Sequence, residues 1–219
     1  MNLLREYIST LLLEAKEPTR VPLDMKIPDD LQKLYRIMND AGKELYVVGG
    51  AVRDTLMSKI PKDYDLATDA SAKEVGKILG AADPTLSINM TGKFQIARVV
   101  TPEGNEYEIT TFRKDMGKGR RPDAVEITTI DKDVERRDLT INALFYDLDT
   151  GEVVDYVGGL EDIESGTIRA VTSQEEGDHP SRRFEEDPLR TLRAVRFAAR
   201  MGSEIEPETK AAILTHNNL

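Results

Sequence analysis

Hydrophobic residues near the start of the chain recur at the spacing of one face of a helix. Residues 1–15 therefore predict a short amphipathic helix. Its apolar positions are Leu3, Leu4, Tyr7, Ile8, Leu11 and Leu12. Residues 16–30 hold three prolines and several charges, which predicts a linker, and a helix is expected over residues 31–41 with Gly42 as its cap. We place a first segment, consisting of the N-terminal helix and linker, at residues 1–25.

The pattern then changes to short apolar runs that predict strands alternating with helices. A buried strand over residues 45–48 leads into the turn Gly49-Gly50 and a helix over residues 51–57, and a second strand is expected over residues 63–68. Two pairs of alternating runs around turn residues predict β-hairpins. The hairpins comprise residues 95–100 with 106–112, and residues 144–148 with 153–156.

Beyond Gly159 the pattern becomes mainly helical. Pro188 suits the first position of a helix, and Gly202 directly follows Met201, the last residue of the periodic pattern. We therefore expect one domain over residues 26–159 and the start of a helical second layer over residues 160–219.

The composition is that of an ordinary soluble protein. Of the 219 residues, 39% are hydrophobic and 32% are charged, and no apolar run approaches the roughly 20 residues that span a bilayer. The N-terminus lacks the basic start and clean apolar stretch of a signal peptide, so we expect a cytoplasmic protein.

Charge and residue types narrow the possible chemistry. The chain has no cysteine, which excludes disulfides, thiolate metal sites and cysteine nucleophiles. Only two histidines are present, His179 and His216, so oxygen-rich metal sites are the plausible kind. A net charge of -10 argues against a bulk electrostatic grip on nucleic acid, and any RNA contact must use local basic patches.

Paired carboxylates are the first candidate for catalytic chemistry. Asp63 and Asp65 are two residues apart in the second predicted strand, so their side chains are expected on one face. Such a pair is costly unless a cation bridges it, and Mg2+ accepts carboxylate oxygens. The alternative interpretation is an exposed polar strand face. Glu106 and Glu108 alternate in another strand, and one of them could supply the third acid that a two-metal site needs.

The turn Gly49-Gly50 between a strand and a helix is a candidate phosphate site. Glycines let backbone N–H groups approach phosphate oxygens, and a helix N-terminus favours negative charge. The Gly-Lys-Ser/Thr ending of a P-loop is missing. A tight connection is the alternative for the glycines alone, but the Asp-x-Asp pattern about a dozen residues later favours the phosphate site.

Four motifs follow one another along the chain: Gly49-Gly50-Ala51-Val52-Arg53-Asp54, Asp63-Tyr64-Asp65, Arg136-Arg137-Asp138-Leu139-Thr140-Ile141-Asn142-Ala143 and Glu186-Asp187-Pro188-Leu189-Arg190. In this order and spacing they resemble the bacterial-type tRNA nucleotidyltransferase (CCA-adding enzyme) and poly(A) polymerase family. The resemblance covers roughly residues 45–202. It implies an α+β fold, in which a catalytic head of mixed, mainly antiparallel sheet flanked by helices is followed by the start of a helical neck.

The resemblance also implies roles for individual residues. Asp63 and Asp65 resemble the metal-binding pair, with two Mg2+ ions expected, and Glu108 is similar to the third carboxylate, which activates the acceptor hydroxyl. The residues implied for triphosphate and ribose binding are Gly49, Gly50, Arg53, Arg137, Asp138 and Asn142. Asp and Asn side chains can hydrogen-bond a ribose hydroxyl, and Arg pairs with phosphate through a planar fork. A helix cap followed by a buried Asn is the structural alternative for the last motif.

Asp187 and Arg190 resemble the family's base-reading pair, in which protein side chains replace a template. A carboxylate accepts from the exocyclic amine of cytosine or adenine, and a guanidinium donates to the acceptors beside it. An Asp before Pro is also an ordinary helix cap, so capping is the alternative interpretation of Asp187.

The helix that follows carries an arginine stripe. Arg193, Arg196 and Arg200 fall on one face with Arg190 at its edge, and another face holds Leu189, Leu192, Val195 and Ala199. We assign Arg193 to base recognition with the pair. The stripe is either a solvated face or a contact for RNA or NTP phosphate. A second candidate patch comprises Lys118, Arg120 and Arg121.

The expected activity is template-independent addition of CMP and AMP, from CTP and ATP, to RNA 3' ends such as the tRNA CCA end. Family enzymes continue into helical domains that hold the tRNA, whereas this sequence stops at Leu219. We therefore expect a truncated neck and a partner chain or oligomer that supplies the RNA grip. The alternatives are a noncatalytic nucleotide- or RNA-binding module and a poly(A) polymerase-type enzyme that needs such a partner. The presence of all three acids favours an enzyme, because a binding module has no need of the acceptor-activating acid.

Overall fold

The structure is a computed structural model, and it describes residues 17–116, 124–172 and 178–216. The predicted N-terminal helix and the patch of Lys118, Arg120 and Arg121 lie outside the described residues. Within these ranges, no helix is both long enough and apolar enough to cross a membrane.

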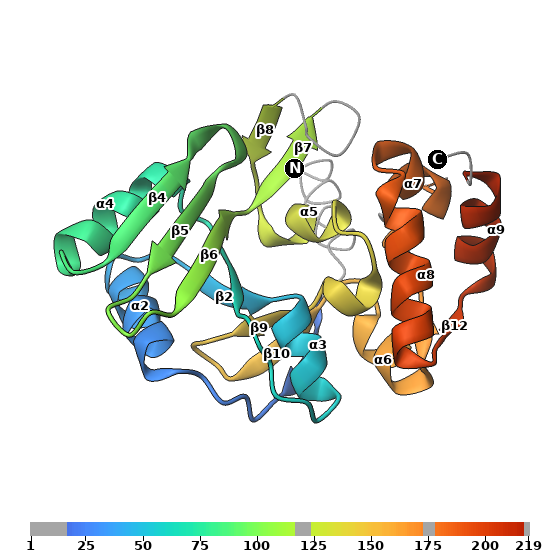
Figure 1. The fold of residues 1–219 in the computed structure, drawn as a ribbon, viewed down its shortest axis with the longest axis horizontal. Coiled ribbons are helices and arrows are strands. Elements are labelled where there is room, and N and C mark those ends of the chain that lie inside the picture. The colour runs from blue at the N-terminus through green and yellow to red at the C-terminus, as the bar shows by residue number, and fades with distance from the viewer. Residues whose placement is uncertain (1–16, 117–123, 173–177, 217–219) are drawn as a thin grey trace, which may run out of the picture.

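Within the described part of the chain, eight strands form one twisted sheet in the order β1-β10-β9-β2-β3-β6-β5-β4 (Figure 1). Neighbouring strands are antiparallel except for β3 and β6, which are parallel. The strands are β1 (Thr19–Pro22), β2 (Leu45–Val48), β3 (Asp65–Thr68), β4 (Ser87–Thr91), β5 (Ile96–Val100), β6 (Glu106–Thr111), β9 (Phe145–Asp147) and β10 (Glu152–Asp155). Both predicted hairpins are present, as β5–β6 and β9–β10. The mixed, mainly antiparallel α+β fold is confirmed.

Helices cover the sheet and continue beyond it. Figure 1 shows α2 and α4 together at the β4 end of the sheet, and α7, α8 and α9 as a separate group at the opposite side of the molecule. The helices are α2 (Asp29–Asp40), α3 (Gly50–Leu56), α4 (Ala72–Ala82), α5 (Ile130–Glu135), α6 (Gly159–Ser165), α7 (Pro180–Glu186), α8 (Leu189–Met201) and α9 (Pro207–Thr215), with 3-10 turns η1 (Gly92–Phe94) and η2 (Thr140–Asn142). Two small sheets pair β7 (Arg113–Met116) with β8 (Ala124–Ile127), and β11 (Thr167–Ile168) with β12 (Glu204–Ile205).

The central strands are buried on both faces, which explains their continuous apolar runs. Val47 and Leu66 pack into the core that lies under α2 and α4, whereas the next residues along, Val48 and Ala67, pack into a second core around Phe145. Successive side chains of a strand point to opposite faces, so a strand covered on both sides reads as uniformly hydrophobic.

The second predicted strand begins two residues later than expected, at Asp65 rather than Asp63. Val48, the last residue of β2, pairs with Asp65, and the chain then leaves the sheet at Gly49, whose φ is 69°. Asp63 therefore has no opposite residue in β2. The strand alternation that placed both aspartates on one face does not apply to Asp63, which precedes the strand.

Helix α8 begins and ends close to the predicted positions. It starts at Leu189, one residue after Pro188, and Gly202 follows it in the left-handed conformation. The packed face differs from the apolar face seen in the sequence, because Leu189, Leu192 and Val195 are 41%, 54% and 47% exposed, and Ala199 is exposed as well. The buried residues of α8 are Thr191, Ala194 and Phe197.

The reason lies in what α8 packs against. Ala194 and Phe197 contact Leu139 and Ile141, in the segment between α5 and β9, and Ile168 of β11. Small residues such as Thr191 and Ala194 permit a close approach, so the largest apolar residues of a helix need not form its packed face.

Gly159 supports the η2 turn, which carries Asn142. A Cβ at this position would overlap the carbonyl oxygen and carbon of Thr140 and press on Leu144. Gly159→Ala is therefore expected to lower the free energy of unfolding by roughly 1–3 kcal/mol, measured by urea denaturation. Gly92→Ala is the control, since a Cβ there meets nothing within 4 Å. Equal stability of the two variants would contradict the close packing of α6 on η2.

Candidate active site

A cleft of about 840 Å3 lies between the head and α8. It is lined by all but one of the candidate site residues, and the exception is Glu108. The candidate residues that line it are Gly49, Gly50, Arg53, Asp63, Asp65, Arg137, Asp138, Asn142, Asp187, Arg190 and Arg193. The structure thus brings together residues that are up to 144 positions apart in the sequence, between Gly49 and Arg193.

The carboxylates lie near the start of β3, which is flanked in the sheet by β2 and β6. Asp65 is the first residue of β3, and in the parallel register with β6 it stands beside Glu108. Asp63 lines the same cleft, and its charge acts on Asp65. The register favours Glu108 over Glu106 as the third acid, because Glu108 is the residue of β6 that pairs with Asp65. Glu106 instead forms an ion pair with Arg98 at 2.8 Å.

Crowding changes the acidity of this group. Limited hydration inside the cleft raises the pKa of Asp65; the charge of Asp63 adds to this rise and that of Arg137 opposes it. Limited hydration also raises the pKa of Glu108, with a further contribution from the charge of Asp65. Among the described residues, no group of three or more His, Asp or Glu side chains is already arranged so that it could hold a metal ion. The like charges and oxygen donors nevertheless fit a hard divalent cation, which would relieve their repulsion.

The turn after β2 lies in close contact with the segment that carries Arg137 and Asn142. Gly49 adopts a positive φ that favours glycine, and its amide donates to the carbonyl of Leu144 at 3.0 Å. A Cβ on Gly49 would lie 3.4 Å from the Asn142 carbonyl oxygen and 3.9 Å from Nη1 of Arg137. The glycine turn therefore lies directly beside the arginine motif.

A chain of polar contacts crosses the cleft. Arg53 donates through Nη1 to Oδ1 of Asn142, and Nδ2 of Asn142 donates to Oδ1 of Asp138 at 3.5 Å. The other oxygen of Asp138 accepts from Nε of Arg193 on α8 at 2.5 Å. Asn142 and Asp138 are both buried, so the structural alternative for this motif is met in part. The arrangement still leaves both residues on the cleft wall.

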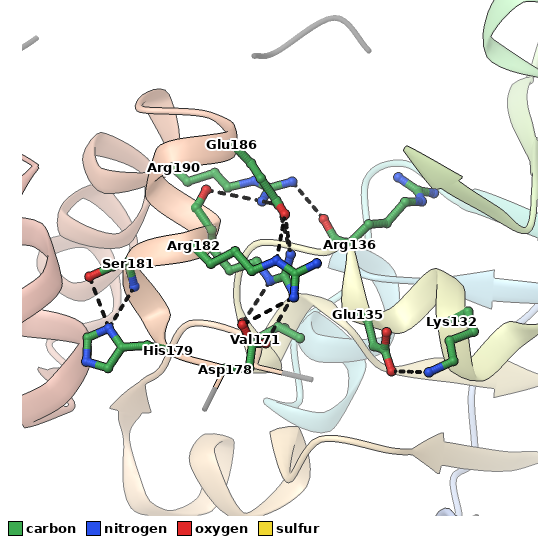
Figure 2. Close-up of polar contacts among 11 residues, drawn as sticks. Lys132, Glu135, Arg136, Val171, Asp178, His179, Ser181, Arg182, Glu186 and Arg190 are labelled. Atoms are coloured by element: carbon green, nitrogen blue, oxygen red, sulfur yellow. Dashed lines mark hydrogen bonds and ion pairs between the residues drawn. The ribbon is translucent and has the colours of Figure 1, made fainter. Parts of the chain in front are cut away.

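Both base-reading candidates are held by contacts within the protein, and Figure 2 shows those of Arg190. Arg190 donates through Nη1 to Glu186 at 2.9 Å and through Nη2 to the carbonyl of Arg136 at 2.7 Å. Asp187 accepts the amide of Leu189 through Oδ1 at 3.0 Å, so it does cap α8 as the structural alternative supposed. Both side chains line the cleft, and capping therefore does not remove Asp187 from it.

Two contributors to the cleft were not singled out from the sequence. Phe197 lies with its ring 5.0 Å from the guanidinium carbon of Arg53 and 5.5 Å from that of Arg196. An aromatic face attracts guanidinium groups, so Phe197 helps to gather positive charge on this wall. Arg136 was noted only as part of a motif. The one available signal was an aromatic residue at helical spacing within an arginine stripe.

The comparisons with known proteins show which family this chain resembles. A family model described as the Poly A polymerase head domain matches residues 45–169. A CCA-adding enzyme of Bacillus subtilis (strain 168) is 42% identical over 189 residues, which cover 85% of this chain and 44% of the relative. A poly(A) polymerase I of Salmonella typhi is 38% identical over 197 residues, which cover 84% of this chain and 39% of the relative.

A solved structure has the same architecture. The crystal structure of the Bacillus stearothermophilus CCA-adding enzyme in complex with CTP superposes with a TM-score of 0.71 at 34% identity, covering 86% of this chain and 44% of that one. The chain belongs to the family of CCA-adding enzymes and poly(A) polymerases that carries this head domain. It spans less than half the length of these relatives.

Proposed function

We propose that the chain is the catalytic head of a template-independent RNA nucleotidyltransferase, which transfers CMP and AMP from CTP and ATP to the CCA end of tRNA. The observation that carries this proposal is the placement of Asp65 beside Glu108, at the edge of a cleft lined with arginines and a glycine turn. Carboxylates suited to a metal ion thus lie beside arginine and backbone N–H donors suited to a triphosphate. The family relationship and the CTP bound to the Bacillus stearothermophilus relative support a nucleotide substrate.

Asp63, Asp65 and Glu108 would hold Mg2+, with two ions expected. The bound ions would supply Lewis acidity for the attacking 3' hydroxyl and charge neutralisation for the departing pyrophosphate. Glu108, beside Asp65, is the group that would receive the hydroxyl proton. No covalent intermediate with the protein is required, since the hydroxyl attacks the α-phosphate of the NTP directly.

The other residues of the cleft would hold the nucleotide. Gly49 and Gly50 let the triphosphate approach the backbone, while Arg53 and Arg137 donate to its oxygens. Asp138 and Asn142 would bind the ribose hydroxyls. Arg193 belongs to the proposed base-recognition set with Asp187 and Arg190, and its 2.5 Å contact with Asp138 links that set to the ribose site. Asp187 and Arg190 would read the base, because their acceptor and donors match cytosine and adenine but not uracil or guanine.

The test is incorporation of each labelled NTP, with Mg2+, into tRNAs that end before CCA, after C and after CC, and into an unrelated RNA. Addition of CMP and AMP confined to the tRNAs is expected. Addition of AMP to every RNA would replace this proposal with a poly(A) polymerase. CTP binding without incorporation into any RNA would overturn the catalytic assignment for this chain and favour a nucleotide-binding module.

Removing one metal carboxylate should stop catalysis without unfolding the head. Asp63→Ala, Asp65→Ala and Glu108→Gln are each expected to lower the rate of incorporation more than about 100-fold, because several kcal/mol of transition-state stabilisation are lost. Glu106→Gln is the matched control, on the same strand and two residues from Glu108, and it should retain activity. Thermal unfolding checks the fold of each variant. Full activity in Asp65→Ala would refute the metal assignment.

Changing the base-reading pair should relax the choice of NTP. Asp187→Asn keeps an oxygen that can cap α8 but adds donors where cytosine and adenine present an amine, and Arg190→Ala removes the paired donor. In both, preference for CTP and ATP over UTP and GTP is expected to fall about tenfold or more in kcat/KM. Arg200→Ala, on the same helix but outside the lining of the cleft, is the control. Unchanged selectivity in both variants would remove the pair from base reading.

A further inference from the structure

We propose that Asp133 is a positioning residue for the phosphate-binding wall of the cleft. It holds the guanidinium groups of Arg137 and Arg136 by one edge and leaves the other edge of Arg137 directed at the Gly49 turn. This inference rests on the proposed function, because it concerns how that site would bind a triphosphate. Asp133 lies outside the lining of the cleft, so its effect on a ligand would be indirect.

The contacts of Asp133 account for both of its oxygens. The residue lies in α5 and is fully buried. Oδ2 accepts from Nε and Nη2 of Arg137 at 3.2 and 3.0 Å. Oδ1 accepts from Nε of Arg136 at 2.8 Å and from the backbone amide of Arg113 at 3.1 Å, and it lies 2.7 Å from Nη2 of Arg136 in an ion pair. One carboxylate thus fixes two planar guanidinium groups at once.

The orientation of Arg137 follows from these contacts. Its guanidinium carbon lies 4.6 Å from the centre of the Phe145 ring, so one flat face is covered. With Nε and Nη2 turned to Asp133, Nη1 remains on the opposite edge. Nη1 lies 3.5 Å from the Asn142 carbonyl and 3.9 Å from the position of a Cβ on Gly49. The outer edge therefore faces the glycine turn, where the proposed triphosphate would lie.

The charges favour an anion on this side of the cleft. Burial by itself would raise the pKa of Asp133, but the charges of Arg137 and Arg136 and the amide of Arg113 outweigh burial and hold this pKa below its ordinary value. Asp133 thus remains an anion that faces two cations. The group of Asp133, Arg136 and Arg137 therefore carries a net charge of about +1, which favours the binding of a phosphate.

Asp133 also keeps Arg137 away from the metal carboxylates. The charge of Arg137 reaches Asp65, where it opposes the rise in pKa that limited hydration causes. A guanidinium released from Asp133 would be drawn toward Asp63 and Asp65 and would compete there with a divalent cation. Arg136, the second arginine that Asp133 holds, would help to position the base-reading residue Arg190, because its backbone carbonyl accepts from Arg190 (Figure 2).

The experiment measures binding of CTP and of inorganic tripolyphosphate to the 219-residue chain by calorimetry. Asp133→Asn is expected to weaken both affinities about tenfold, the scale of one charge-assisted hydrogen bond. Asp83→Asn is the matched control, since Asp83 is a buried carboxylate whose 2.5 Å contact with Lys33 lies outside the cleft. It should affect thermal unfolding but neither affinity. Should Asp133→Asn fail to fold, Asp133→Glu keeps the charge, displaces it by one methylene, and is expected to weaken binding as well.

Measurements in an Arg137→Ala variant distinguish a positioning role of Asp133 from a general loss of structure. In Arg137→Ala, the further change Asp133→Asn should cost much less than tenfold of the remaining tripolyphosphate affinity, because Asp133 acts on the triphosphate mainly through Arg137. An undiminished tenfold loss in that background would overturn the inference. So would unchanged affinities in Asp133→Asn, or in Asp133→Glu where that variant replaces it. If the wild-type chain bound neither CTP nor tripolyphosphate, the proposed function itself would fail.

Discussion

The parallel pairing of β3 with β6 is the constraint on which the rest of the cleft depends. It is the one parallel contact among the described strands of the central sheet, and its register stands Asp65 beside Glu108. On the other edge of β3, Asp65 faces Val48, after which β2 breaks at Gly49. A slip of one residue in either ladder would take Asp65 away from its place beside Glu108 and Val48, and would turn Leu66 into the second core, where the smaller Ala67 packs. The energy of the buried core therefore fixes the position of the carboxylates.

The side of the cleft that carries Arg137 and Asn142 is held in place by contacts between charged and polar side chains rather than by a sheet. Asp133 ties two arginines to α5, and the chain from Arg53 through Asn142 and Asp138 continues to Arg193 on α8. A buried ion pair costs desolvation and adds little stability on balance, but each partner fixes the other's geometry. Such contacts suit a wall that must present donors at defined positions more than one that must only hold a fold together.

Much of this arrangement could be predicted from the sequence, but side-chain placement could not. The two hairpins and the strand at residues 45–48 carry strong local patterns, and the ordered motifs identified the residues of the cleft. The start of β3 was misjudged, because strand alternation ignores where the partner strand ends. The packed face of α8 was missed, since two of its buried residues, Thr191 and Ala194, are small, and the packing of Ala194 against Leu139 and Ile141 is revealed only by the tertiary structure. The one local signal for Phe197 is its place within the arginine stripe, and this signal does not reveal that its ring contacts Arg53 of α3 as well as Arg196.

The proposed selection of bases without a template would place a particular demand on this fold. Two side chains can discriminate between bases only if their donors and acceptors stay fixed, because a flexible guanidinium would adapt to uracil or guanine. Arg190 is anchored at Nη1 by Glu186 and at Nη2 by the Arg136 carbonyl, while the cap that Asp187 forms on α8 fixes its carboxylate. The helix cap that seemed an alternative to base reading is therefore what would make base reading selective. Since the side chain of Arg136 is itself held by Asp133, the same buried carboxylate supports the proposed phosphate-binding arginines. Through the contact of the Arg136 carbonyl with Arg190, it also supports the proposed base-reading pair.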